Sequence, residues 1–205
     1  MKGINMFKKY WFIFLALALT ITAIITGCET LQTTGTSGGR EYFPNTDGYS
    51  WTYRATFSGT TETQTLKISF SGTATAGSLT VQKWKSEIFS GTAVYTSESY
   101  LRVTDADVKY YGDPTYPSTI ETGTFLAFPL KVGSKWFTYG TSEANVVALE
   151  NITVLLGAYN NCFKVKASSG SINTYMWFAQ NIGCIKVQQT MGTFEVNMDL
   201  TSKNF

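Results

Sequence analysis

Short segments rich in β-branched and aromatic residues recur from residue 41 onward, and this pattern limits most strongly what the chain can fold into. Gly, Ser or Asp lies at or near the ends of each segment, as is typical of strands joined by tight turns. Only residues 125–132 hint at another structure, and Pro129 argues against a helix there. The pattern therefore predicts an all-β, antiparallel protein. The expected strands are residues 50–58, 65–70, 79–89, 94–103, 108–111, 135–140, 146–156, 162–167, 173–179, 184–189 and 193–200.

One motif occurs twice. The pattern Phe-Pro-x3-Gly-x2-Trp occupies residues 43–51 and returns at residues 128–136, an offset of 85 residues. In each copy the proline restricts the backbone, the glycine permits a tight turn, and the tryptophan, Trp51 or Trp136, begins a strand with its ring toward the core. Solenoid repeats span about 20–50 residues, so this longer offset predicts duplication of a small β unit.

The first 27 residues have the three parts of a secretory signal. Lysines stand at the start without any acidic residue, residues 11–25 are uncharged and largely apolar, and small residues follow. Residues 25–28, Ile-Thr-Gly-Cys, resemble the lipobox of bacterial lipoproteins. The resemblance implies cleavage after Gly27, a diacylglycerol on the thiol of Cys28, and often an acylated amino terminus. The alternative is an uncleaved membrane helix with an incidental cysteine, but 15 apolar residues fall short of the ~20 that a span needs.

Beyond the signal, the composition excludes several classes of function. Residues 28–40 are polar and rich in Gly, Thr and Ser, which predicts a flexible tether. Without the signal, 13 basic and 14 acidic residues leave a net charge of −1, which gives no reason to expect nucleic acid. The chain has no histidine, so the commonest general base and zinc ligand are missing. We therefore expect no enzyme activity, no cofactor and no metal.

The repeated motif, together with residues 157–165 and 177–186, resembles a group of uncharacterised bacterial lipoproteins over nearly the whole mature chain. Their repeats open with a phrase like FPLKVGxxW, and the second repeat ends near one like WYAPGVGLVK. This chain departs from the pattern at Leu156, where the group has proline, and at residues 180–181, where Gln-Asn replaces Pro-Gly. The resemblance implies two tandem antiparallel β-meander repeats that form curved sheets or half-barrels. We place these repeats at residues 41–123 and 124–205, with the seam at 113–123.

Two sets of carboxylates could form a functional site, and each also has a simpler structural interpretation. Asp105 and Asp107, with Asp113 nearby, could hold calcium, but calcium prefers six to eight oxygens and the stretch lacks a 12-residue loop with a closing Glu. Aspartate at a hairpin turn is the simpler interpretation. Glu87 and Glu98 could form the carboxylate pair of a glycosidase, yet both lie at expected solvated strand positions.

Two cysteines remain in the exported part. Alternation along the expected strands places Cys162 with Lys164, and Cys184 with Lys186, so both thiols are expected to face outward on one side of a sheet. In a meander, strand 173–179 lies between them. Their Cα atoms would then be about 9–10 Å apart, beyond the ~7 Å limit for a disulfide. We expect them to remain unbridged, although an exported protein meets oxidising conditions.

The large aromatic side chains could serve either of two roles. Trp51, Trp84, Trp136 and Trp177 could line a pocket for a lipid, glycan or peptide, but such residues more often fill a sheet core, and we expect Trp136 and Trp177 to point inward. We predict a non-enzymatic binding or scaffolding module of the cell envelope, held to a bacterial membrane through Cys28. In a two-membrane envelope this would be the outer membrane. An envelope protein is the expected partner, and a carrier enclosing an apolar ligand in a half-barrel is the alternative.

Overall fold

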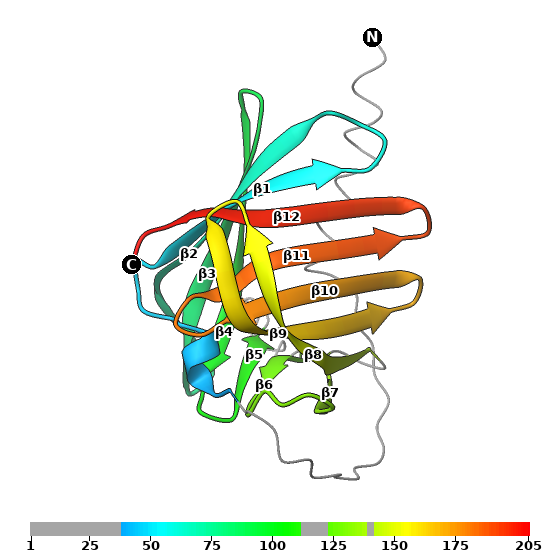
Figure 1. Ribbon diagram of the computed structural model, residues 1–205. Helices are drawn as coiled ribbons and strands as arrows, with labels where there is room; N and C mark the ends of the chain where they lie inside the picture. Colours follow the sequence, from blue (N-terminus) through cyan, green and yellow to red (C-terminus); the bar gives the residue numbers. More distant parts are fainter. Residues whose placement is uncertain (1–37, 112–122, 139–141) are drawn as a thin grey trace.

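The chain folds almost entirely into antiparallel strands, as the sequence predicts (Figure 1). The computed structural model describes residues 38–111, 123–138 and 142–205. The elements are η1 (Arg40–Tyr42), β1 (Ser50–Phe57), β2 (Thr63–Ala76), β3 (Leu79–Ser90), β4 (Ala93–Val103), β5 (Asp107–Tyr111), β6 (Gly123–Ala127), β7 (Lys135–Phe137), β8 (Glu143–Val154), β9 (Gly157–Ser169), β10 (Ile172–Ala179), β11 (Gly183–Met191) and β12 (Phe194–Lys203).

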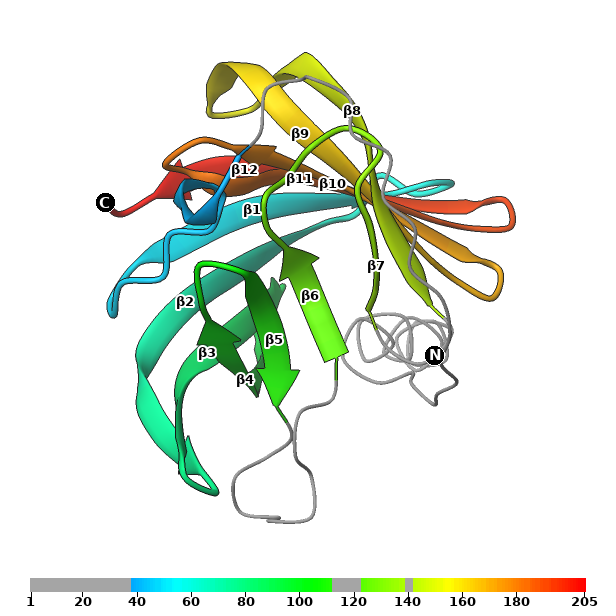
Figure 2. The ribbon, with the colours of Figure 1, turned by 90° about the horizontal axis from the view of Figure 1, so that it is seen from below.

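All described strands form one sheet in the order β6-β5-β4-β3-β2-β1-β12-β11-β10-β9-β8-β7. Apart from β6 and β7, which lie at the two edges, strands adjacent in the chain are neighbours in the sheet, which confirms the predicted meander, and β1 also pairs with β12. The sheet curls until its two edge strands, β6 and β7, approach each other (Figure 2). The amide of Thr124 donates to the carbonyl oxygen of Thr138 at 2.9 Å across this opening. The result is a nearly closed, barrel-like sheet.

Alternation along the strands builds one core from both halves of the chain. In β1, Trp51, Tyr53 and Ala55 are buried while Arg54 is exposed, because successive side chains point to opposite faces. The buried side chains of β12 belong to the same cluster as those of β1. Trp51 and Trp136 are only 5% and 9% exposed, so the expectation that both are buried is confirmed.

Several strands differ in length from those expected, with β2 and β9 longer than predicted, and two further differences concern which residues form strands and turns. Residues 123–127, which were not predicted as a strand, form β6 because β5 supplies a pairing partner, with Val108 opposite Leu126. The β8–β9 turn falls at Leu155 and Leu156, which continue an apolar pattern and so look like strand residues in the sequence. This hairpin crosses β10 and β11 in Figure 1, and the amide of Leu156 donates to the carbonyl oxygen of Leu200 in β12 at 2.9 Å.

Candidate functional site

Cys28, the predicted lipid attachment residue, lies outside the described residues, so the candidate site is the place where the chain that follows it joins the body. Gly38 exchanges two backbone hydrogen bonds with Leu130, at 2.7 and 2.5 Å. Leu130 lies between β6 and β7, beside the opening of the sheet. The last residues of the predicted tether, 38–40, thus belong to the folded body. We call residues 38–45 the arm.

Close packing holds the start of the arm in place. A Cβ atom added to Gly38 would lie 2.7 Å from the Phe163 ring and still closer to the Tyr42 ring, so only glycine fits there. Tyr42 itself packs edge-on against Phe163 with ring centroids 5.0 Å apart. The arm therefore contacts β9 from the second half of the chain.

The next residues of the arm enter the core. Phe43 packs against Phe70 of β2, Trp84 of β3 and Phe125 of β6, with centroids 5.8–6.4 Å apart. Pro44 lies close to Gly183, where an added Cβ would be 3.4 Å from the proline ring. Rings from the arm, the first half and β6 thus fill the space inside the sheet. Trp84 is one of these core rings and is partly buried, which agrees with the simpler interpretation of the tryptophans.

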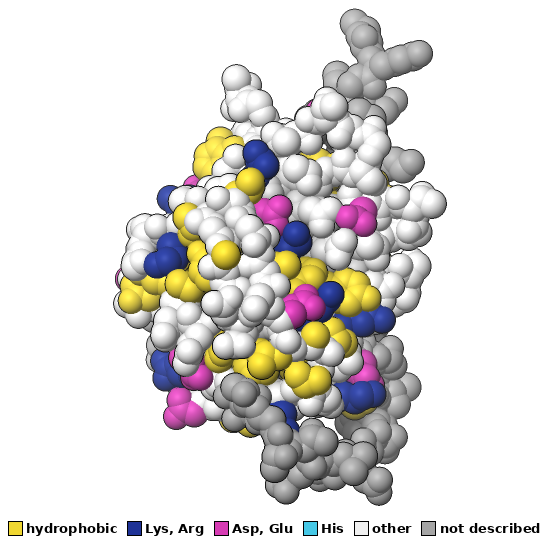
Figure 3. Space-filling model, viewed as in Figure 1, with side chains coloured by type: hydrophobic (Ala, Val, Ile, Leu, Met, Phe, Trp, Pro, Cys, Tyr) yellow, Lys and Arg dark blue, Asp and Glu magenta, His cyan; other side chains and the backbone are white. Residues whose placement is uncertain are grey.

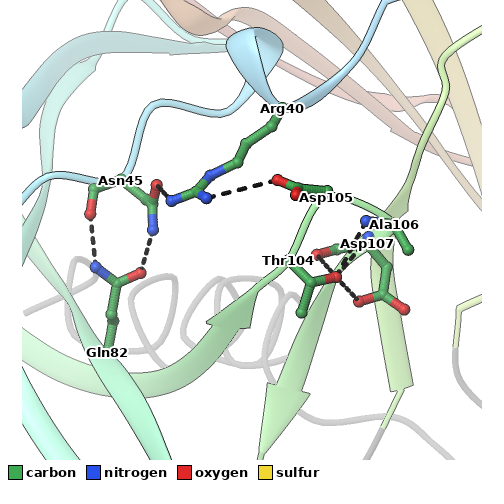
Figure 4. A network of polar contacts seen from close by, with 7 residues as sticks. All are labelled: Arg40, Asn45, Gln82, Thr104, Asp105, Ala106 and Asp107. Carbon is green, nitrogen blue, oxygen red and sulfur yellow. Dashed lines mark hydrogen bonds and ion pairs between the residues drawn. The ribbon is translucent and has the colours of Figure 1, made fainter.

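Polar contacts connect the arm to β3, to the β4–β5 turn and to the β10–β11 turn, and Figure 4 shows the first two. The Arg40 guanidinium donates to Asn45 Oδ1 at 3.2 Å and lies 3.6 Å from a carboxylate oxygen of Asp105 in the β4–β5 turn. Asn45 and Gln82 of β3 form a reciprocal pair, at 2.5 and 2.6 Å. The amide of Asn181, in the β10–β11 turn, donates to the carbonyl oxygen of Glu41 at 2.7 Å.

These bonds differ in strength. Both members of the Arg40–Asp105 pair are exposed, so that pair adds little to stability. The Asn45–Gln82 pair is partly buried and better shielded from water, so it contributes more to holding the arm. The arm consequently joins β3, the β4–β5 turn, the β6–β7 connection, β9 and the β10–β11 turn.

The aspartates considered for calcium behave as turn residues. Asp105 is directed to Arg40, as Figure 4 shows. Asp107 accepts a hydrogen bond from the Thr104 hydroxyl at 2.8 Å and lies 3.7 Å from the Lys109 ammonium. Asp113 lies outside the described residues. Within the described ranges, no three His, Cys, Asp or Glu side chains are grouped so that they could hold a metal ion.

Glu87 and Glu98 lie on the neighbouring strands β3 and β4, and each contacts a side chain of its own strand. Glu87 pairs with the Lys85 ammonium at 2.8 Å, and Lys85 lies opposite Glu98 in the strand register. Glu98 also accepts a hydrogen bond from the Tyr100 hydroxyl at 3.5 Å. Opposite charges at facing positions, such as Lys85 and Glu98, stabilise a sheet modestly.

Trp177 belongs to a group of interacting residues that the sequence did not predict. The expectation that it points inward is wrong: it lies directly opposite Lys164 and Lys186, on the face away from Met176 and Phe178. It is nevertheless buried, because Lys164 covers its ring at 4.7 Å and Lys186 approaches it at 5.9 Å.

Hydrogen bonds and ion pairs complete this outward group. The Trp177 indole nitrogen donates to Glu150 Oε1 at 2.5 Å, Glu150 also pairs with Lys164 at 3.6 Å, and Lys186 pairs with Asp199 at 3.2 Å. Every charge is matched by an opposite one, so the group is a stabilised surface rather than an open ligand site. In Figure 3, basic, acidic and hydrophobic side chains are accordingly interspersed across the visible face.

The two cysteines are unbridged, as expected, and β10 lies between their strands. Cys162 is fully buried and Cys184 is partly buried, so neither thiol is exposed to solvent as a position on an outward face would suggest. Burial raises the pKa of Cys162 to about 11 and that of Cys184 to about 12. Both thiols are therefore protonated and poorly nucleophilic at neutral pH.

None of the described helices has the length and apolar character needed to cross a membrane. No protein-family model matches the chain, and no curated protein matches it.

Two solved structures share its fold. One is a protein of Bacteroides fragilis described as exported and as having a YmcC-like fold. It has 15% sequence identity and a TM-score of 0.52, and the match covers 80% of this chain and 98% of that one. The other, described as a lipoprotein, comes from Parabacteroides distasonis, with 12% identity, a TM-score of 0.51 and the same coverage. At these identities the likeness establishes the fold: an all-β chain with the architecture of these two proteins.

Proposed function

We propose that this chain is a lipoprotein of the bacterial cell envelope whose barrel-like body acts as a non-enzymatic binding or scaffolding module. An acyl group on Cys28 would hold it to a membrane, which in a two-membrane envelope would be the outer one. The observation that carries the proposal is the arm. Ten residues after the lipobox cysteine, the chain is tied to five places at one end of the body, so the anchor would hold the whole domain as one unit.

The filled interior supports a module rather than a carrier. Phe43, Phe70, Phe125 and Phe178 are linked in a chain of ring contacts between 5.8 and 6.4 Å through the centre of the sheet. A carrier of an apolar molecule would need a connected cavity of at least ~300 Å³. Because the protein's own rings occupy this region, we assign recognition of a partner to the turns and the outward faces of the sheet.

The chemistry of the titratable groups supports the absence of catalysis. The chain has no histidine, and its two described thiols have raised pKa values. The carboxylates considered for catalysis are engaged with neighbouring lysine or tyrosine side chains. These groups lack the base and the activated nucleophile that covalent catalysis requires.

The anchor is tested by replacing the cysteine. In cells fed a labelled fatty acid, the wild-type chain should be labelled and should sediment with membranes, while Cys28→Ala should lose both properties. Cys184→Ala is the matched control, because it removes a thiol from the body and should stay labelled. Fatty acid still incorporated into Cys28→Ala would refute the proposed anchor.

The module is tested against the carrier by native mass spectrometry. The Cys28→Ala chain, expressed without residues 1–27, should have the mass of the polypeptide alone. An apolar molecule retained at near-unit stoichiometry, and recovered by lipid extraction, would favour the carrier instead.

A further inference from the structure

The position of the arm determines which end of the body lies nearest the membrane, if Cys28 is the anchor as proposed above. Gly38 is ten residues beyond Cys28, and ten residues span at most about 35 Å however they are arranged. Gly38 is bonded to Leu130, so the β6–β7 connection is held within that distance of the acyl chains.

Exposed apolar side chains lie at this same place. Val132, two residues after Leu130, is 43% exposed, and Phe137 of β7 is 50% exposed. Lys135 shares the outward face of β7 with Phe137, while Trp136 between them is buried. We call Val132, Lys135 and Phe137 the anchor-side patch.

Exposed apolar side chains also lie at the opposite end of the body, and they serve as a comparison. Phe89 and Val94 face each other across the β3–β4 hairpin and are 37% and 54% exposed. This hairpin extends to the top of Figure 1, away from η1. The other end of β4 leads into the β4–β5 turn that contacts Arg40. Val94 and Val103 are nine positions apart along β4, which is about 30 Å of strand.

We propose that the anchor-side patch rests on the bilayer that holds the Cys28 acyl chains, with Val132 and Phe137 in the interfacial region. Aromatic and aliphatic side chains at this depth gain free energy by leaving water, and a lysine beside them can extend its ammonium to the headgroups. We assign the bilayer, rather than another protein, to this patch. The ten-residue connection from Cys28 to Gly38 keeps the bilayer within reach of the patch in every copy of the anchored protein.

The charges around the anchor-side patch indicate whether anionic lipid is needed for the contact. Lys135 is paired with Glu143 at 3.0 Å, so this part of the patch carries little net positive charge. Apolar contact, rather than attraction to anionic lipid, therefore carries the interaction. It should persist in neutral phosphatidylcholine vesicles and at high salt.

A matched pair of labels tests the proposal. The acylated full-length protein is placed in phosphatidylcholine vesicles with a fluorophore on Val132→Cys or on Val94→Cys. Both sites are exposed valines, and the native thiols are shielded by burial and raised pKa values. Lipids with a quencher near the headgroup should quench the label at 132 at least threefold more than the label at 94. Equal quenching, or stronger quenching at 94, would overturn the proposal.

Substitution of the patch provides a second readout. With a label on Ser134→Cys, the double change Val132→Ser and Phe137→Ser should reduce quenching at least twofold. The control change, Phe89→Ser with Val94→Ser, should leave it unaltered. No difference between the two double variants would also contradict a lipid-facing patch.

The two proposals fail in distinguishable ways. Mass spectrometry of the same sample reports whether Cys28 carries acyl chains, and flotation reports whether the protein is on the vesicles. An unacylated protein that does not float refutes the anchor. An acylated, floating protein with an unquenched label at 132 refutes the patch alone.

Discussion

Gly48 and Gly133, 85 residues apart, form the same turn in the two halves of the chain. Their φ angles are 85° and 92°. The amide of Gly48 donates to the carbonyl oxygen of Phe70 at 3.0 Å, and that of Gly133 donates to Val146 at 2.8 Å. Phe70 and Val146 then donate back to the residue after each glycine, at 3.0 and 2.9 Å. The two copies of the motif thus form equivalent turns within one sheet and one core.

Alanine at either glycine should destabilise the protein to a similar extent. Neither position has a heavy atom within 4 Å of an added Cβ, so the cost comes from the left-handed backbone alone. We expect Gly48→Ala and Gly133→Ala each to lower the free energy of unfolding by about 1–2 kcal/mol. Gly39→Ala is the control, since its φ is −103° and an added Cβ would meet only the flexible Glu41 side chain, at 3.0 Å. Urea denaturation measures all three, and a loss at Gly39 equal to the others would contradict the explanation.

The paired tryptophans should differ when each is changed to phenylalanine. The Trp51 indole nitrogen donates to the carbonyl oxygen of Ile182 at 2.6 Å, whereas that of Trp136 has no hydrogen-bond partner among the described residues. Trp51→Phe removes a bond and leaves a carbonyl unpaired, so it should cost about 1–3 kcal/mol more than Trp136→Phe. Either Trp→Ala change should cost about 3–5 kcal/mol. Equal losses for the two Phe variants in urea denaturation would contradict this difference.

The thiols of Cys162 and Cys184 should be present but shielded. At pH 8 the native protein should react slowly with a thiol reagent, because burial keeps both groups protonated. After denaturation without a reducing agent, both thiols should react at once, in a sample whose Cys28 is acylated or replaced. If no thiol is counted after denaturation, the two cysteines are bridged, and either the strand order is wrong or the sheet curls enough to bring them together.

Stability should fall at alkaline pH. Burial raises the pKa of the Tyr53 hydroxyl, which donates to the carbonyl oxygen of Cys184 at 2.7 Å, and it raises the pKa of the Cys184 thiol to about 12. The unfolded chain would lose these protons near pH 10 and pH 8.5, before the folded one does. The unfolded state then binds fewer protons, so this stabilisation is complete below about pH 8.5 and is lost as the pH rises.

Urea denaturation at pH 7, 9 and 10.5 checks this dependence. Tyr53→Phe should be less stable than wild type at pH 7, because the hydrogen bond is gone, but it should lose less stability between pH 9 and 10.5. Parallel pH profiles for the two proteins would show that Tyr53 does not contribute to the alkaline loss.

Features that depend on nearby residues could be predicted from the sequence. The all-β class, the meander, the repeated turn and the burial of Trp51 and Trp136 follow from alternation and turn residues within a few positions. The unbridged cysteines also followed, because the meander places one strand between them. These properties are local, so a single sequence carries enough information to specify them.

Only the tertiary structure decided the pairing of β1 with β12, the docking of the arm, and the surroundings of Trp177 and Cys162. Trp177 meets Lys164 and Lys186 because three strands are held in one register, and a shift of one residue would move each side chain to the other face. Cys162 follows Asn161, whose φ is +54°, at a bulge where β8 and β9 lose regular alternation. Gly38 finds Leu130 ninety-two residues away. Such contacts depend on how the whole sheet curls, and the pattern of any one segment does not record that curvature.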